Sequence, residues 1–229
     1  MDWGTLHLLS YPTPLPPELW ADAVVNRILA VLAMLAALLV LRDYLRVFPL
    51  LAGCLVRSRG NIEIEHSVSQ ARARNRCALA GMFIFGLLAD RYLLYPNSYL
   101  QTLPHGWRYA ALLGVLTAYL LLRGLLALLL RKPKLDSESR SGALTALWNY
   151  FLTALPLMLL STGLIWLFGG SDAAARIVFY AEIFIILLFT FIREGQILRS
   201  KYSPLQTFLY LCGLELIPLA ALIVPGAVL

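Results

Sequence analysis

The chain has 229 residues, of which 60% are hydrophobic and 14% are charged, and its formal net charge is +6. Soluble domains are typically ~45–50% apolar and ~25% charged, so this composition excludes an ordinary soluble domain. The apolar residues also lie in long blocks, which is typical of a polytopic membrane protein.

The cysteines and histidines predict no metal or redox site. The three cysteines (Cys54, Cys77 and Cys212) are far apart and form no CxxC pair, and the three histidines form no HExxH pattern. We therefore expect free thiols that behave as small apolar side chains, no metal and no cofactor.

Six stretches approach the ~20 apolar residues that a transmembrane helix needs. We predict an all-α polytopic membrane protein, a bundle of about six transmembrane helices in a single domain over 22–229. The residues before it, 1–21, are expected to form an exposed tail, because their prolines prevent a continuous helix. Asp90 and Arg91, expected as a solvated pair at the outer interface, weaken the second stretch. In chain order the predicted spans are 22–41, 77–95, 107–130, 143–168, 173–192 and 205–224.

Short motifs predict two of the boundaries between these spans. Gly169 and Gly170 are suited to end a helix and Ser171–Asp172 to cap the next one, so the fourth and fifth spans are expected to be antiparallel neighbours. Ser203 precedes Pro204, a residue favoured at the first helical position, and this pair predicts the start of the sixth span.

The basic residues predict an orientation. Most of the 19 Lys and Arg residues lie in three alternate loops, which follow the first, third and fifth spans. The positive-inside rule makes these loops cytoplasmic and puts the N and C termini both outside the cytoplasm. We expect a multi-pass protein of the bacterial inner (cytoplasmic) membrane whose positive charge contacts anionic lipid head groups, so no nucleic-acid partner is needed to explain it.

The longest polar stretch is the segment 42–76 between the first two spans. Its beginning, RDYLRVFPLLAGCLV, is too short to span, and we expect an interfacial or re-entrant helix broken near Pro49. IEIEHSV then alternates like a short strand. The arginines that follow it are expected on the cytoplasmic surface, against anionic lipid or, alternatively, in a docking patch for another protein.

Three charged residues lie deep inside the predicted spans, at Arg123, Glu182 and Glu215. A charge near the bilayer centre costs ~2.5–3.5 kcal/mol even on the lenient insertion scale, so such residues usually have a partner. Counted from the predicted cytoplasmic ends, the three head groups can lie in one layer of the bundle. We expect Arg123 to pair with Glu215, Glu182 or both, with Asn149 and Tyr180 available to complete the hydrogen bonding.

Two prolines predict kinks beside this cluster. Pro218 lies three residues after Glu215 and leaves the Leu214 carbonyl without its helical donor, and Pro156 interrupts the fourth span in the same way. A free carbonyl beside a buried carboxyl would suit ion coordination, but a packing kink is the plainer interpretation. The charged cluster itself has three interpretations: a charge-compensated packing site, a proton- or ion-handling site, and a docking site for a partner subunit.

The last span carries the most distinctive motif, FLYLCGLELIPLAALI. It resembles the C-terminal signature of an uncharacterised family of Bacteroidota integral inner-membrane proteins, a domain of unknown function with a YLCxLEIxP-like motif. The matching positions are Tyr210, Leu211, Cys212, Leu214, Glu215, Leu216 and Pro218, with Ile217 as an extra residue before the proline. The resemblance implies an inner-membrane location and draws attention to Glu215 without assigning it a role.

The functional prediction rests mainly on the absence of known catalytic motifs from the sequence. The sequence contains no GxSxG, HExxH, P-loop or GxGxxG pattern, so we predict no catalytic residues. The first interpretation is a non-catalytic subunit or accessory factor of a larger envelope complex for transport, secretion or biogenesis, with other membrane subunits as partners. The alternatives are a small proton- or ion-coupled carrier or channel using Glu182 and Glu215, and a membrane enzyme acting on lipid.

Overall fold

The computed structural model describes residues 20, 22–57, 60–95, 97–129, 137–199 and 202–228. These residues form helices joined by short turns and include no strand, which confirms the all-α prediction for this part of the chain. The predicted tail, 1–21, lies outside the described residues apart from Trp20, which is helical. The elements are α2 (Val24–Val56), α3 (Gly60–His66), α4 (Val68–Arg91), α5 (Ser98–Thr102), α6 (His105–Leu129), α7 (Ser137–Leu167), α8 (Asp172–Arg199), α9 (Pro204–Leu211), the π-helical turn η1 (Cys212–Leu216) and α10 (Ile217–Val228).

Within the described ranges, five helical segments are long and apolar enough to cross a membrane, which makes the chain a multi-pass membrane protein by length and composition. They are Val24–Leu55, Gly106–Leu129, Ser141–Leu167, Asp172–Arg199 and Pro204–Ile223. A sixth span over 77–95 is not confirmed, because α4 is not among these segments. Its apolar part, 77–89, would cover only about 20 Å of a hydrocarbon core of about 30 Å, and charged residues flank it on both sides.

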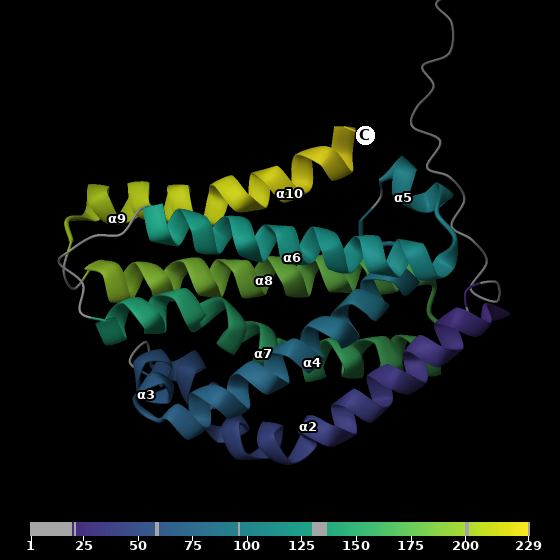
Figure 1. Ribbon diagram of the computed structural model, residues 1–229, viewed down its shortest axis with the longest axis horizontal. Coiled ribbons are helices and arrows are strands. Elements are labelled where there is room, and N and C mark those ends of the chain that lie inside the picture. Colours follow the sequence, from purple (N-terminus) through teal and green to yellow (C-terminus); the bar gives the residue numbers. More distant parts are fainter. Residues whose placement is uncertain are drawn as a thin grey trace, which may run out of the picture.

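The helices form one elongated bundle. In Figure 1, α6, α8 and the α9–η1–α10 segment run along its long axis, while α4 crosses obliquely from the end that holds α3 to the end that holds α5. The closest packing is between α7 and α8, and α2 packs along α4. Helices α7 and α8 are joined by the predicted hairpin. Gly169 has a φ of +68°, a conformation that suits a residue without a Cβ. The Ser171 hydroxyl then accepts a hydrogen bond from the Ala174 N–H at 3.2 Å.

The segment 42–76 is helical over most of its described residues, which agrees with the helix expected at its start but not with a strand at IEIEHSV. Helix α2 continues past Pro49 to Val56, and its ribbon bends in this second half (Figure 1). Part of IEIEHSV forms helix α3, which packs against α7 and buries Ile64 completely. The alternation of apolar and polar residues in IEIEHSV was misleading, because a helix of about two turns can also bury one side of so short a segment.

Arg74 corrects the expectation that the arginines of this segment lie on the surface. Its side chain is only 2% exposed and forms an ion pair with Glu65 of α3. Its neighbours on α4 follow the expectation more closely, since Arg72 is exposed and the Arg76 side chain is 60% exposed while it pairs with Asp43 at 2.9 Å.

The hydrophobic core lies where α2, α3, α4, α7 and α8 meet. Its fully buried members are large or close-fitting apolar side chains, among them Val47, Leu51, Cys54, Ile64, Tyr150, Leu152, Met158 and Phe179. On the outside, many large apolar side chains remain exposed along α2, α6 and α8, as expected for surfaces covered by lipid.

Candidate functional site

Arg123 of α6 lies between two buried glutamates from two other elements. Its Nη2 is 2.7 Å from Glu194 Oε1 of α8 and 2.5 Å from Glu215 Oε1 of η1. Its Nε also donates to Glu215 Oε1 at 2.7 Å, and its Nη1 donates to the Leu144 carbonyl of α7 at 2.8 Å. The guanidinium therefore ties together α6, α7, α8 and η1 at one depth, and we call Arg123, Glu194 and Glu215 the charged triad.

The π-helical turn η1 presents Glu215 to this site. The Ile217 N–H donates to the Cys212 carbonyl five residues back, and Pro218 follows directly without an N–H of its own. The wider turn adds a residue to the helical path just before the proline. It leaves Glu215 only 7% exposed while its neighbour Leu216 is 46% exposed, so the carboxyl faces the bundle interior.

Glu194 is the member of the triad that sequence reasoning missed. We ended the fifth span at Ile192, before Arg193, whereas α8 continues to Arg199 and its Glu194 is completely buried. A signal was present in the helical spacing. The positions 186, 190, 194, 197 and 198 are all buried and follow the i, i+4 rhythm that marks one face of a helix.

Glu182 lies apart from the triad. At ~1.5 Å per residue it is about 18 Å from Glu194 along α8, too far for Arg123 to reach both. The Glu182 side chain instead hydrogen-bonds with Ser161 of α7, and its Oε2 is buried with no partner among the described residues. Tyr180 is also placed elsewhere, because its hydroxyl donates to the Leu94 carbonyl at 2.8 Å.

Asn149 belongs to a second buried cluster. Its Nδ2 donates to Asn61 Oδ1 of α3 at 2.8 Å, and Asn61 Nδ2 donates to the Tyr150 hydroxyl at 2.9 Å. The Tyr150 hydroxyl in turn lies 3.2 Å from the Cys54 carbonyl of α2. Both asparagines are 0% exposed, so this cluster locks α3 against α7 and α2 rather than completing the triad.

The Arg74–Glu65 pair forms a third cluster next to α7. Glu65 Oε2 accepts a hydrogen bond from Ser141 at 2.9 Å and its Oε1 accepts one from Thr145 at 3.1 Å. Partial burial acts to raise the pKa of Glu65, but the hydrogen bond and charge of Arg74, with the two hydroxyls, outweigh it and lower the pKa below its ordinary value. The carboxylate is therefore an ionised anchor of α3 and α4.

Asp90 lies near the other end of α4, where it pairs with Arg108 of α6 rather than with its neighbour Arg91. Asp90 is 0% and Arg108 3% exposed, and Trp20 Nε1 donates to the second carboxyl oxygen of Asp90 at 2.8 Å. Arg91 lies 4.0 Å from Asp172 and packs over the ring of Trp20. The expectation of a solvated Asp90–Arg91 pair was wrong, because the start of α6 offers Asp90 a buried cation.

Pro156 has a specific structural consequence inside α7. A proline lacks the N–H that would bond the carbonyl four residues earlier, here that of Leu152. The Tyr44 hydroxyl of α2 lies 3.2 Å from this oxygen and supplies the missing donor. The kink residue thus provides an acceptor through which α2 is attached to α7.

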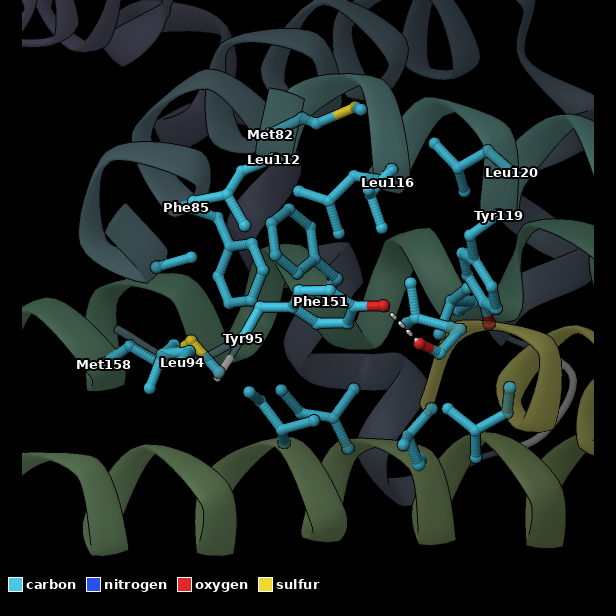
Figure 2. A pocket seen from close by; sticks show the side chains of 18 of the residues that line it. Met82, Phe85, Leu94, Tyr95, Leu112, Leu116, Tyr119, Leu120, Phe151 and Met158 are labelled. Atoms are coloured by element: carbon cyan, nitrogen blue, oxygen red, sulfur yellow. Dashed lines mark hydrogen bonds between the residues drawn. The ribbon is translucent and has the colours of Figure 1, made fainter. Parts of the chain in front are cut away.

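A cavity of about 230 Å³ lies between α4, α6, α7, α8 and α10. Its wall is almost wholly hydrophobic, and Figure 2 shows aromatic and aliphatic side chains pointing into it from several helices. Tyr119 lies toward one end of it, while Leu94 and Met158 lie toward the other (Figure 2). The Tyr95 hydroxyl reaches the Leu222 carbonyl at 2.9 Å, drawn as the dashed line in Figure 2.

The cavity and the charged triad are neighbours. Tyr119 lines the cavity, and its phenol also lies close enough to Glu215, Arg123 and Glu194 to interact with their charges. The described residues contain no group of three or more His, Cys, Asp or Glu side chains that could hold a metal ion. The site combines a half-open apolar pocket with a buried charged cluster near the Tyr119 end.

Comparisons of the chain with protein-family models, with curated proteins and with solved structures give no match. The resemblance to the Bacteroidota membrane-protein family consequently stays a prediction.

Proposed function

We propose that this chain is a non-catalytic membrane protein that binds the apolar part of a lipid, or of another lipid-soluble molecule, in the cavity between α4, α6, α7, α8 and α10. The cavity is the observation that carries the proposal. Its volume of about 230 Å³ exceeds the ~150 Å³ of an engineered apolar cavity that stays dry and binds benzene.

The polar groups near the cavity favour an apolar ligand. The hydroxyls of Tyr95 and Tyr180 already donate to backbone carbonyls, so they present mainly ring carbon to the interior. Ligand pockets are usually apolar with a few placed polar groups, and here the charged group is confined to the Tyr119 end. A hydrocarbon chain or ring fits this lining, whereas a hydrated ion does not.

A photo-reactive lipid tests the proposal. The protein would be reconstituted in vesicles of phosphatidylethanolamine and phosphatidylglycerol that contain a diazirine-bearing fatty acid, and the cross-linked residues would be mapped by mass spectrometry. We expect labelling at cavity residues such as Tyr95 and Met158. Leu116→Trp, which fills the cavity, should reduce it several-fold.

The matched control is Leu121→Trp, on the same helix at a position that is 70% exposed. This variant should leave cavity labelling unchanged. Labelling confined to outward-facing residues, or equal labelling in both tryptophan variants, would refute ligand binding in the cavity.

The remaining features of the proposal concern location and partners. The apolar spans and the asymmetry of basic loops support a bacterial inner membrane, with basic residues on anionic head groups. Both termini lie outside the cytoplasm if α4 crosses together with the five apolar spans. The exposed apolar faces of α2 and α8 could contact other membrane subunits of an envelope complex as well as lipid.

The two alternatives receive less support. A carrier that uses Glu182 and Glu215 together would need the two carboxyls on one path, but Glu215 lies with Glu194, which is about 18 Å from Glu182 along α8. An enzyme acting on lipid would need a nucleophile or metal beside the cavity, and the described lining offers mainly hydrocarbon and tyrosine.

A further inference from the structure

The charged triad contains one more carboxyl than cations. The side chains of Arg123 and Glu215 are 6% and 8% exposed, and that of Glu194 is 0% exposed. If both glutamates were ionised, one guanidinium would face two carboxylates. One negative charge would then lie uncompensated in the interior, where charges are strongly disfavoured.

No second cation balances this charge among the described residues. Helix α6 contributes Arg123 and Tyr119, and α7 contributes the Leu144 carbonyl, which is a further acceptor. The adjacent cation, Arg193 of α8, donates from its guanidinium to the Leu55 carbonyl and to Gln196. Tyr150 of α7 uses its hydroxyl in the Asn61 cluster.

The two carboxyls also meet each other. The side chains of Glu194 and Glu215 are within hydrogen-bonding range, and Glu194 Oε2 is buried without a donor among the described residues. Two ionised carboxylates offer acceptors only, so their contact becomes a hydrogen bond only when one of them carries a proton. Carboxyl pairs held this close characteristically bind one shared proton.

We propose that Glu194 and Glu215 share one dissociable proton, which makes the charged triad a proton-binding site inside the bundle. With that proton bound, the triad is neutral, because Arg123 balances the remaining carboxylate. Loss of the proton leaves the triad negatively charged beside Tyr119, at one end of the cavity. This inference stands on the triad alone and does not depend on the cavity binding a lipid.

Infrared spectroscopy of the protein in lipid vesicles tests the proposal, because a protonated carboxyl has its own carbonyl stretch, which shifts in D₂O. The measurement uses the Glu182→Gln background, so that the other intramembrane carboxyl does not contribute. At pH 7 this protein should retain a band equal to one protonated carboxyl. Adding either Glu194→Gln or Glu215→Gln should abolish the band, since Arg123 then faces one carboxylate and neutralises it.

Absence of the band in the Glu182→Gln protein, or its persistence in both double variants, would overturn the proposal. So would a stability that rises with sodium in a protein lacking the band, which would assign the site to a cation. If neither double variant folds, the pH dependence of unfolding in the Glu182→Gln protein decides. A folded state that holds an extra proton becomes less stable as the pH rises, by up to tenfold in the unfolding constant per pH unit. A stability independent of pH across the neutral range would then exclude the bound proton.

Discussion

At the scale of single residues, Arg123 has the largest structural role. It is 5% exposed and bonds to a carboxyl of α8, a carboxyl of η1 and a carbonyl of α7. Removal of one partner from a buried ion pair leaves the other partner's charge without compensation, which makes such sites expensive to break even where the intact pair contributes little net stability.

We expect Arg123→Leu to lower the free energy of unfolding by about 3 kcal/mol or more, measured by reversible unfolding in mixed micelles. The double variant Arg123→Leu/Glu215→Leu should recover much of this loss, because it removes a carboxyl that the first change strands. Purely additive losses would contradict direct contact.

Arg27→Leu is the comparison variant for this experiment. Arg27 pairs with Asp22 at 3.1 Å, but its side chain is 64% exposed. Exposed ion pairs typically contribute ~0–1 kcal/mol, so a much smaller loss is expected there than at Arg123.

At the scale of the helical elements, two interrupted helices create polar contacts that a regular helix would lack. The π-helical turn η1 turns Glu215 inward just before Pro218. Pro156 frees the Leu152 carbonyl of α7, and Tyr44 of α2 bonds to it. Such interruptions in membrane helices persist where neighbouring side chains satisfy the freed backbone groups.

A double-mutant cycle tests the link between Tyr44 and the Pro156 kink. Tyr44→Phe removes the hydroxyl and should lower the free energy of unfolding by ~0.5–1.5 kcal/mol. In the Pro156→Ala background the loss should be smaller, because the alanine N–H can donate to the Leu152 carbonyl. An equal loss in the two backgrounds, measured by the same unfolding assay, would show that the hydroxyl acts independently of the kink.

At the scale of the whole molecule, α4 decides how the chain is threaded through the membrane. It crosses the bundle from the α3 end to the α5 end (Figure 1), yet it is too charged to count among the five candidate spans. Burial of Arg74 against Glu65 and of Asp90 against Arg108 removes two of its charges from lipid. A helix whose charges are enclosed by protein in this way can lie at membrane depth without an apolar surface of its own.

The topology prediction follows from this threading. If α4 crosses with the five apolar spans, both termini lie on the non-cytoplasmic side, so alkaline phosphatase fused after Leu229 should be active and a fluorescent protein fused there should stay dark. A fusion within residues 130–136 should give the opposite pair of results. Termini on opposite sides would mean that α4 does not cross.

The class of the protein and most of its apolar helices follow from local properties of the sequence. Long apolar blocks can satisfy their backbone groups in lipid only as helices, so the predictions near 22–41, 107–130, 143–168, 173–192 and 205–224 each coincide with a candidate span. Depth along the helices also predicted Glu215 as one possible partner for Arg123, because rise per residue is a local property.

Only the tertiary structure decided which polar groups meet. Glu194 joins Arg123 in place of Glu182, Asn149 contacts Asn61, and Arg74 is buried on Glu65. Which side chains pair depends on the length of each helix, its rotation about its axis and the helices that pack beside it. These properties result from all the contacts of the folded chain and cannot be read from one segment of the sequence. The cavity is likewise a property of five helices at once, since its volume is the space that their packed side chains leave unfilled.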